Sequence, residues 1–157
     1  MAKLEIDFNE DFFKALGKAA DVDRLAPKLI DAALPILRNR VKTAYGAFTV
    51  ARDISIVKTK KANGGGYVGT VTPAGETGHY YRKIPKNVKG PVKHDHYRYP
   101  LSNGGLAVFL EFGVKAHGNF PALPAGGYMA RAVAASQDDV QAKMQETYEK
   151  ETEALKL

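Results

Sequence analysis

The sequence contains no cysteine, which excludes both a disulfide framework and a zinc site with thiolate ligands. It has no apolar run that approaches the ~18 residues of a membrane-spanning helix. Near the start, Glu5 and Asp7 stand where the apolar core of a signal peptide would lie. These absences predict a protein that folds in a cytosol and has no membrane partner.

Sequence patterns for catalysis are also missing. There is no serine-centred elbow and no Walker loop. Residues 63–66 (Asn-Gly-Gly-Gly) precede a strand-like segment, whereas a phosphate cradle needs a helix start. Glu76 and Glu111 have no spacing that predicts a carboxylate pair. Glu111 fits a partner of Lys or Arg at a strand end better than a general base. We therefore expect no enzyme activity and no cofactor.

One segment resembles a metal site. In His94-Asp95-His96, the two imidazoles would share a face of an extended strand and could bind one ion. His79 or His117 would have to supply a third ligand from a distance. A lone His-x-His in a basic loop is usually solvated, so we expect no metal here. A metal hydrolase built on this pair would lack a supporting acid–base set.

The charge of the chain is unevenly distributed. A length of 157 residues predicts a single domain over 1–157, burying roughly 70% of its unfolded surface. Residues 1–31 carry five Lys/Arg against seven Asp/Glu, and residues 136–157 carry three against six. Residues 32–135 hold fifteen basic residues and four acidic ones. This basic centre fits a nucleic-acid surface, or a solvated region that meets an acidic neighbour such as another copy.

Helical periodicity dominates both ends of the chain. From Asp23 to Tyr45, apolar residues recur every three or four positions and predict a long amphipathic helix. Pro35 should kink it. A second helical pattern follows Pro124. Its apolar stripe consists of Met129, Val133, Val140, Met144, Tyr148 and Leu155.

Between the helices the period changes to the alternation of strands. Residues 48–56 and 67–72 predict two strands, and the turn at 63–66 joins them as a hairpin. Residues 106–113 are almost continuously apolar and predict a strand buried on both faces. The predicted fold class is α+β, with the kinked N-terminal helix and the C-terminal helix packed on a mainly antiparallel sheet.

Residues 76–105 are predicted to form a long extended arm between strands. Pro85, Pro91 and Pro100 argue against a helix, and the segment combines tyrosines with basic residues. Three interpretations stay open: an arm that wraps a partner, an arm packed on its own domain, and a loop that stacks on bases and binds phosphates. The candidate subunit-interface residues are Tyr80, Tyr81, Arg82, Lys83, Lys86, Tyr97, Arg98 and Tyr99.

Three segments resemble the tail-component (neck, head–tail joining or tail-completion) proteins of long-tailed bacteriophages. They are residues 110–113 (Leu-Glu-Phe-Gly), 121–124 (Pro-Ala-Leu-Pro) and 128–132 (Tyr-Met-Ala-Arg-Ala). Members have a strand ending in acid, aromatic, glycine and threonine, then a bend and an aromatic entering the last helix. Here Val114 replaces the threonine, and residues 125–128 replace the usual Pro-Phe. The fold-defining positions that the resemblance implies are Glu111, Phe112, Gly113, Pro124 and Tyr128.

The resemblance implies a structural subunit of the virion neck rather than an enzyme. Copies would form a six-fold ring at the head–tail junction or tail end, with head-connector and tail proteins as neighbours. DNA would pass through the lumen without specific binding, and assembly would take place in the host cytoplasm. The residues alone leave an alternative, a basic nucleic-acid-binding module that uses the 76–105 arm.

Overall fold

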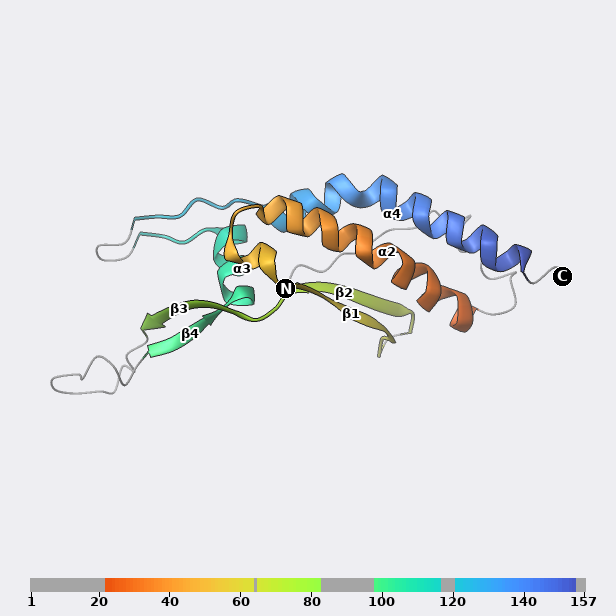
Figure 1. Cartoon of the computed structure of the whole chain (residues 1–157), viewed down its shortest axis with the longest axis horizontal. Helices are drawn as coiled ribbons and strands as arrows, with labels where there is room; N and C mark the ends of the chain where they lie inside the picture. Colours follow the sequence, from red (N-terminus) through yellow and green to blue (C-terminus); the bar gives the residue numbers. More distant parts are fainter. Residues whose placement is uncertain (1–21, 64, 83–97, 117–120, 155–157) are drawn as a thin grey trace.

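The computed structural model in Figure 1 describes residues 22–63, 65–82, 98–116 and 121–154, with the backbone alone for 80–82, 98 and 99. The helices are α2 (Val22–Tyr45), the 3-10 helix η1 (Thr49–Arg52), α3 (Asn103–Phe112) and α4 (Tyr128–Glu153). The strands are β1 (Ile54–Lys61), β2 (Tyr67–Pro73), β3 (Glu76–Arg82) and β4 (Arg98–Ser102). The metal-like pair His94 and His96 lies outside the described residues.

Helix α2 follows the predicted amphipathic pattern to within a residue at either end. Its buried residues recur at helical spacing and are Leu25, Leu29, Ala33, Leu34, Leu37, Val41 and Tyr45. The helix is continuous past Pro27 and Pro35, and the predicted kink at Pro35 stays a prediction. Gly46 follows at a φ of 51°, and its N–H donates to the carbonyl of Lys42 at 3.1 Å, which ends the helix.

Helix α4 lies antiparallel to α2 along its length (Figure 1). Ion pairs join Lys28 to Glu151 and Arg40 to Asp139 across the two helices, each at 2.6 Å. Exposed pairs of this kind contribute little, so buried apolar side chains must hold the helices together. These are Leu25, Leu29 and Ala33 of α2 and Val140 and Met144 of α4. Of the predicted stripe on α4, Met129, Val133 and Tyr148 are half-buried, and Leu155 lies outside the described residues.

The predicted hairpin is confirmed as β1 and β2, and one of its faces packs on α2. Gly69 approaches α2 so closely that a Cβ at that position would lie 2.6 Å from Cγ2 of Ile30. Thr59 donates its N–H and its hydroxyl to one carboxylate oxygen of Asp31, at 3.2 and 2.6 Å. A glycine and a short polar side chain therefore let the strands lie directly on the helix.

The hairpin departs from the prediction in its boundary and its register. Residues 49–52 form η1, so the first strand begins at Ile54 rather than at Phe48. A β-bulge between Val57 and Lys60 shifts the pairing by one residue. The extra residue at the bulge breaks the strict alternation of side chains along β1.

Strands β3 and β4 form a second antiparallel ribbon that projects away from the two long helices (Figure 1). Its principal contacts outside the ribbon are with α3. Asn103, 3% exposed, fixes the root of the ribbon. Its N–H donates to the carbonyl of Gly75 at 3.0 Å, and its side-chain amide donates to the carbonyl of Ala74 at 2.6 Å. These hydrogen bonds therefore fix the direction in which the described part of the predicted arm extends from α3.

The predicted strand over residues 106–113 is wrong, because this run forms helix α3. Ser102 is the N-cap, with its hydroxyl accepting the N–H of Gly105 at 3.0 Å, and Gly113 follows at a φ of 74°. The buried residues of α3 are Asn103, Ala107 and Leu110. A short run that is apolar on every side has no period by which to distinguish a helix from a buried strand. Its leucines and alanine favour the helix by intrinsic propensity.

The core has two apolar clusters, and α2 contributes to both. The larger one joins the second half of α2 to η1, β1, α3 and the start of α4. The other joins the first half of α2 to the second half of α4. The predicted α+β fold class is confirmed, with the strands arranged as two separate two-stranded antiparallel sheets.

Candidate functional site

Glu111 joins α3 to α4. Its carboxylate accepts the N–H of Met129 at 2.7 Å and the N–H of Ala130 at 3.1 Å, two donors that the first turn of α4 cannot satisfy internally. A carboxylate at a helix N-terminus is also favoured by the helix dipole. The expected Lys or Arg partner is thus wrong for Glu111, and its carboxylate caps a helix instead.

Gly113 allows the chain to turn back from α3 towards α4. A Cβ at this position would lie 2.5 Å from the carbonyl oxygen of Leu123 and 3.0 Å from the carbonyl carbon of Pro124. Val114 and Leu123 pair as an antiparallel bridge through two hydrogen bonds of 2.8 Å. Because φ is positive and backbone atoms lie so close, this turn requires glycine.

Tyr128 begins α4 and packs into the larger core cluster. Its ring stacks on Tyr45 with centroids 5.5 Å apart and meets Phe48 edge-on at 5.4 Å. The guanidinium of Arg131 lies over the same ring, 4.8 Å from the centroid, and donates to the carbonyl of Gly126. Tyr128 therefore anchors the start of α4 against the end of α2.

Tyr45 lies beneath this joint and is 1% exposed. Burial raises the pKa of Tyr45 to about 12, and the negative charge of Glu111 acts in the same direction. The phenol is therefore neutral across the physiological pH range. A neutral buried phenol suits a packing role better than acid–base chemistry.

Several exposed apolar side chains lie on α3 and on the bridge that follows it. They are Val108, Phe109, Phe112, Val114 and Leu123. These are five of the nine large apolar residues that are exposed within the described part of the chain, and Phe112 is 68% exposed. On α3, Val108 and Phe112 are four residues apart and Phe109 and Phe112 three apart, so the three share one side. Exposed apolar side chains that gather in this way are typical of interaction surfaces.

The predicted interface residues fall partly on the projecting ribbon. In its ladder, Tyr80 pairs with Pro100, Tyr81 with Tyr99 and Arg82 with Arg98. The structure thus brings five predicted residues together along the backbone, namely Tyr80, Tyr81, Arg82, Arg98 and Tyr99. Lys83, Lys86 and Tyr97 lie outside the described residues.

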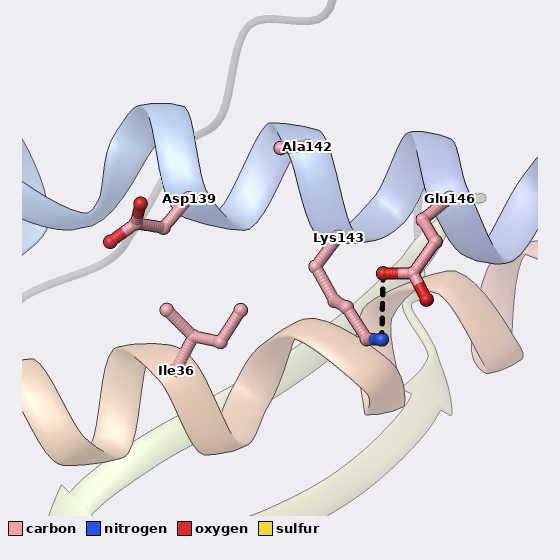
Figure 2. Close-up of a pocket in the computed structure, with 5 residues that line it drawn as sticks. All are labelled: Ile36, Asp139, Ala142, Lys143 and Glu146. Atoms are coloured by element: carbon pink, nitrogen blue, oxygen red, sulfur yellow. Dashed lines mark hydrogen bonds and ion pairs between the residues drawn. The ribbon is translucent and has the colours of Figure 1, made fainter.

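A shallow groove runs between α2 and α4 (Figure 2). Its lining consists of Ile36, Asp139, Ala142, Lys143 and Glu146. Lys143 donates to Glu146 at 2.8 Å, and this hydrogen bond holds the pKa of the Glu146 carboxyl below its usual range. Asp139 is paired with Arg40. Because its charges are paired within the chain, the groove has little to offer a charged ligand.

Further chemistry is not apparent in the part of the chain that the structure describes. No three His, Asp or Glu side chains gather there to hold a metal. Among the same residues, no helix combines the length and the apolarity that a bilayer crossing needs.

Sequence reasoning identified the positions of the joint but missed what they do. Glu111 stands eighteen positions before Met129 in the sequence, and only the folded loop shows that the two residues meet. The outward side of α3 was missed because its residues were assigned to a buried strand. Comparison of the chain with protein-family models, with curated proteins and with solved structures found no match.

Proposed function

We propose that this protein is a non-enzymatic structural subunit of a phage or prophage virion neck, at the head–tail junction or at the tail end as a tail-completion protein. The observation that supports this is the joint between α3 and α4. Glu111, Gly113, Pro124 and Tyr128, by which the sequence resembles the neck proteins, act together there. The strand that family members have at this segment is helix α3 here, so the support lies in the meeting of these residues and not in the local conformation.

Self-association is the second part of the proposal. Phe112 is 68% exposed, and with its neighbours it forms an apolar surface that water solvates poorly. A ring in which each copy covers this surface would remove that cost at every subunit. The ring order that follows from the resemblance is six.

The neighbours in this proposal are head-connector and tail proteins of the virion. The ribbon of β3 and β4 projects beyond the body (Figure 1), so it can reach an adjacent protein or an adjacent copy. Its sequence combines tyrosines with Arg82 and Arg98, residue types enriched at interfaces. DNA would pass through the lumen without specific binding.

The direct test measures the native mass of the purified protein, alone and after mixing with head and tail preparations. We expect a closed oligomer, or a monomer that joins one of the two particles. A chain that stays monomeric at high concentration and joins neither particle would contradict the proposal.

A charge reversal separates the arm from the rest of the fold. Replacing Arg82, Lys83 and Lys86 by Glu should weaken assembly about tenfold or more while the thermal midpoint of the monomer changes little. A loss of assembly without a change in the thermal midpoint would locate the effect at an interface. The matched control reverses Lys42, Arg52 and Lys150, three exposed basic residues outside the arm. Equal loss of assembly in both variants would show that only net charge matters.

The alternative is a nucleic-acid-binding module. Lys58 and Lys60 of β1 are exposed and have no carboxylate partner in the described part of the chain, which adds to the basic arm. A salt titration of duplex DNA binding tests it, because log affinity falls with log salt by about 0.9 for each phosphate neutralised on B-DNA. A steep slope from a monomer would favour this module over the neck subunit.

A further inference from the structure

The start of α3 contains a buried oxygen atom that has no partner. Asn103 is 3% exposed, and its Nδ2 and its backbone N–H donate to the carbonyls of Ala74 and Gly75, respectively. Its Oδ1 atom accepts no hydrogen bond from any group in the described part of the chain. An amide oxygen can only accept, so a buried one needs either a hydrogen-bond donor or a cation.

A carboxylate without a partner lies beside the same amide. A Cβ on Gly75 would lie 2.6 Å from Oδ2 of Asp53 and 3.7 Å from Nδ2 of Asn103, so both side chains approach the space that this glycine leaves open. Glu76 follows Gly75 directly and is exposed. Among the described residues, neither the Asp53 nor the Glu76 carboxylate forms an ion pair or accepts a hydrogen bond. Three acceptors therefore gather around one point without a donor.

A cation explains this arrangement better than a water molecule does. A water could donate to Oδ1 of Asn103 and to Asp53, but it would leave two negative charges without a counter-charge. Calcium takes oxygen ligands of these types, namely carboxylates, Asn amides, backbone carbonyls and waters, and it tolerates irregular geometry. Magnesium requires a near-ideal octahedron and fits less well.

We propose that Asp53, Glu76 and Oδ1 of Asn103 bind one calcium ion, with waters completing its ligands. The site joins the residue before β1, the turn between β2 and β3, and the start of α3. It lies at the root of the ribbon, so the bound ion would hold the ribbon more firmly in its direction. The inference goes beyond the proposed function and does not depend on it.

The affinity should be weak. The site has two carboxylates, and the partial positive charge at the start of α3 opposes a cation. These features correspond to a dissociation constant on the order of 0.1–1 mM.

The test uses the whole chain, freed of divalent ions with a chelator and then titrated with calcium chloride. At 10 mM calcium (about 10–100 times the dissociation constant) the thermal midpoint should rise by roughly 3–10 °C. Sodium chloride of the same ionic strength is the reference, and magnesium chloride should raise the midpoint less. Isothermal titration calorimetry measures the binding directly.

Two variants locate the site. Asp53→Asn keeps the shape of an exposed side chain but removes its charge, and it should lose most of the calcium-dependent rise. The matched control is Asp138→Asn, an exposed carboxylate on α4, which should keep the rise. Asn103→Asp places a carboxylate at the buried position and should bind calcium about tenfold more tightly, a gain that a purely structural role of Asn103 would not produce. If Asn103→Asp does not fold, Asp53→Asn still decides.

Two results would overturn the proposal. An unchanged midpoint and no binding heat in the native protein would mean that a water satisfies Asn103. An equal rise in the native protein and in Asp53→Asn would place calcium elsewhere on the chain. Native mass and the joining of head or tail particles are measured separately, so failure of the proposed function would leave this result standing.

Discussion

Replacing Glu111 by Ala tests the central claim about the α3–α4 joint. The substitution removes both acceptors of the N–H groups of Met129 and Ala130, at 2.7 and 3.1 Å. It leaves two donors at the start of α4 without a partner in the chain and removes a negative charge from the helix N-terminus. The side chain is half-buried and water can reach only part of the site, so solvent should replace these bonds incompletely.

The expected cost follows from these contacts. Hydrogen bonds to charged groups contribute about 1.5–3 kcal/mol each, whereas loss of a helix cap costs about 0.5–2 kcal/mol. The bond to Ala130 is the longer and more exposed of the two, so we expect a total loss of about 2–4 kcal/mol. In a chain of this size that loss lowers the thermal midpoint by roughly 5–15 °C. Glu111→Gln retains one acceptor oxygen, so its thermal midpoint should lie between those of the native protein and Glu111→Ala.

Thermal unfolding followed by circular dichroism measures the total loss of stability. Amide hydrogen exchange shows which part of the chain loses it. In Glu111→Ala, the amides of Met129 and Ala130 should exchange faster than they do in the native protein, because the first turn of α4 loses its cap. The exchange rates of amides in the middle of α4 should change less. The control is Glu153→Gln, an exposed carboxylate near the other end of the same helix, which should change stability by less than about 0.5 kcal/mol. If Glu111→Ala and Glu153→Gln behaved alike, the capping argument would be refuted.

Two further predictions concern the same region. Gly113→Ala should destabilise the fold by more than about 2 kcal/mol, because φ at this position is positive and the new Cβ would meet the carbonyl of Leu123. Gly104→Ala, in the first turn of α3, should instead stabilise the fold by about 0.5–1 kcal/mol. Urea unfolding measures the free energy of unfolding of both variants. Because the pKa of Tyr45 is raised from 10.0 to about 12, its contribution to stability is complete below pH 10 and is lost as the pH rises through 12. Unfolding midpoints followed between these pH values should show that loss in the native protein and a smaller one in Tyr45→Phe.

The sequence predicted the parts of the fold whose pattern is long or whose turn chemistry is specific. The apolar positions of α2 extend over 24 residues, enough for the helical period to be unambiguous. The glycines before Tyr67 indicated the hairpin. The start of β1 was missed, because Thr49–Arg52 makes a single 3-10 turn too short to leave a periodic signal.

The capping role of Glu111 was beyond the sequence because it depends on a fold-back. The glutamate and the amide of Met129 are eighteen residues apart, and they meet only because Gly113 turns the chain and Val114 pairs with Leu123. Local rules for helix caps examine the three or four residues before a helix. These rules do not identify a capping residue that belongs to another helix.

The error over residues 106–113 is informative about assembly. A run that is apolar on every side predicts burial on every side, and this was the reason for assigning a central strand. The folded chain buries only the side of α3 that has Ala107 and Leu110, and leaves Val108, Phe109 and Phe112 in water. The conformation was predicted wrongly, but the composition still requires an explanation, since a surface helix ordinarily has a polar outer face. Coverage by a second copy would supply it, because the run would then be buried on both sides in the assembly.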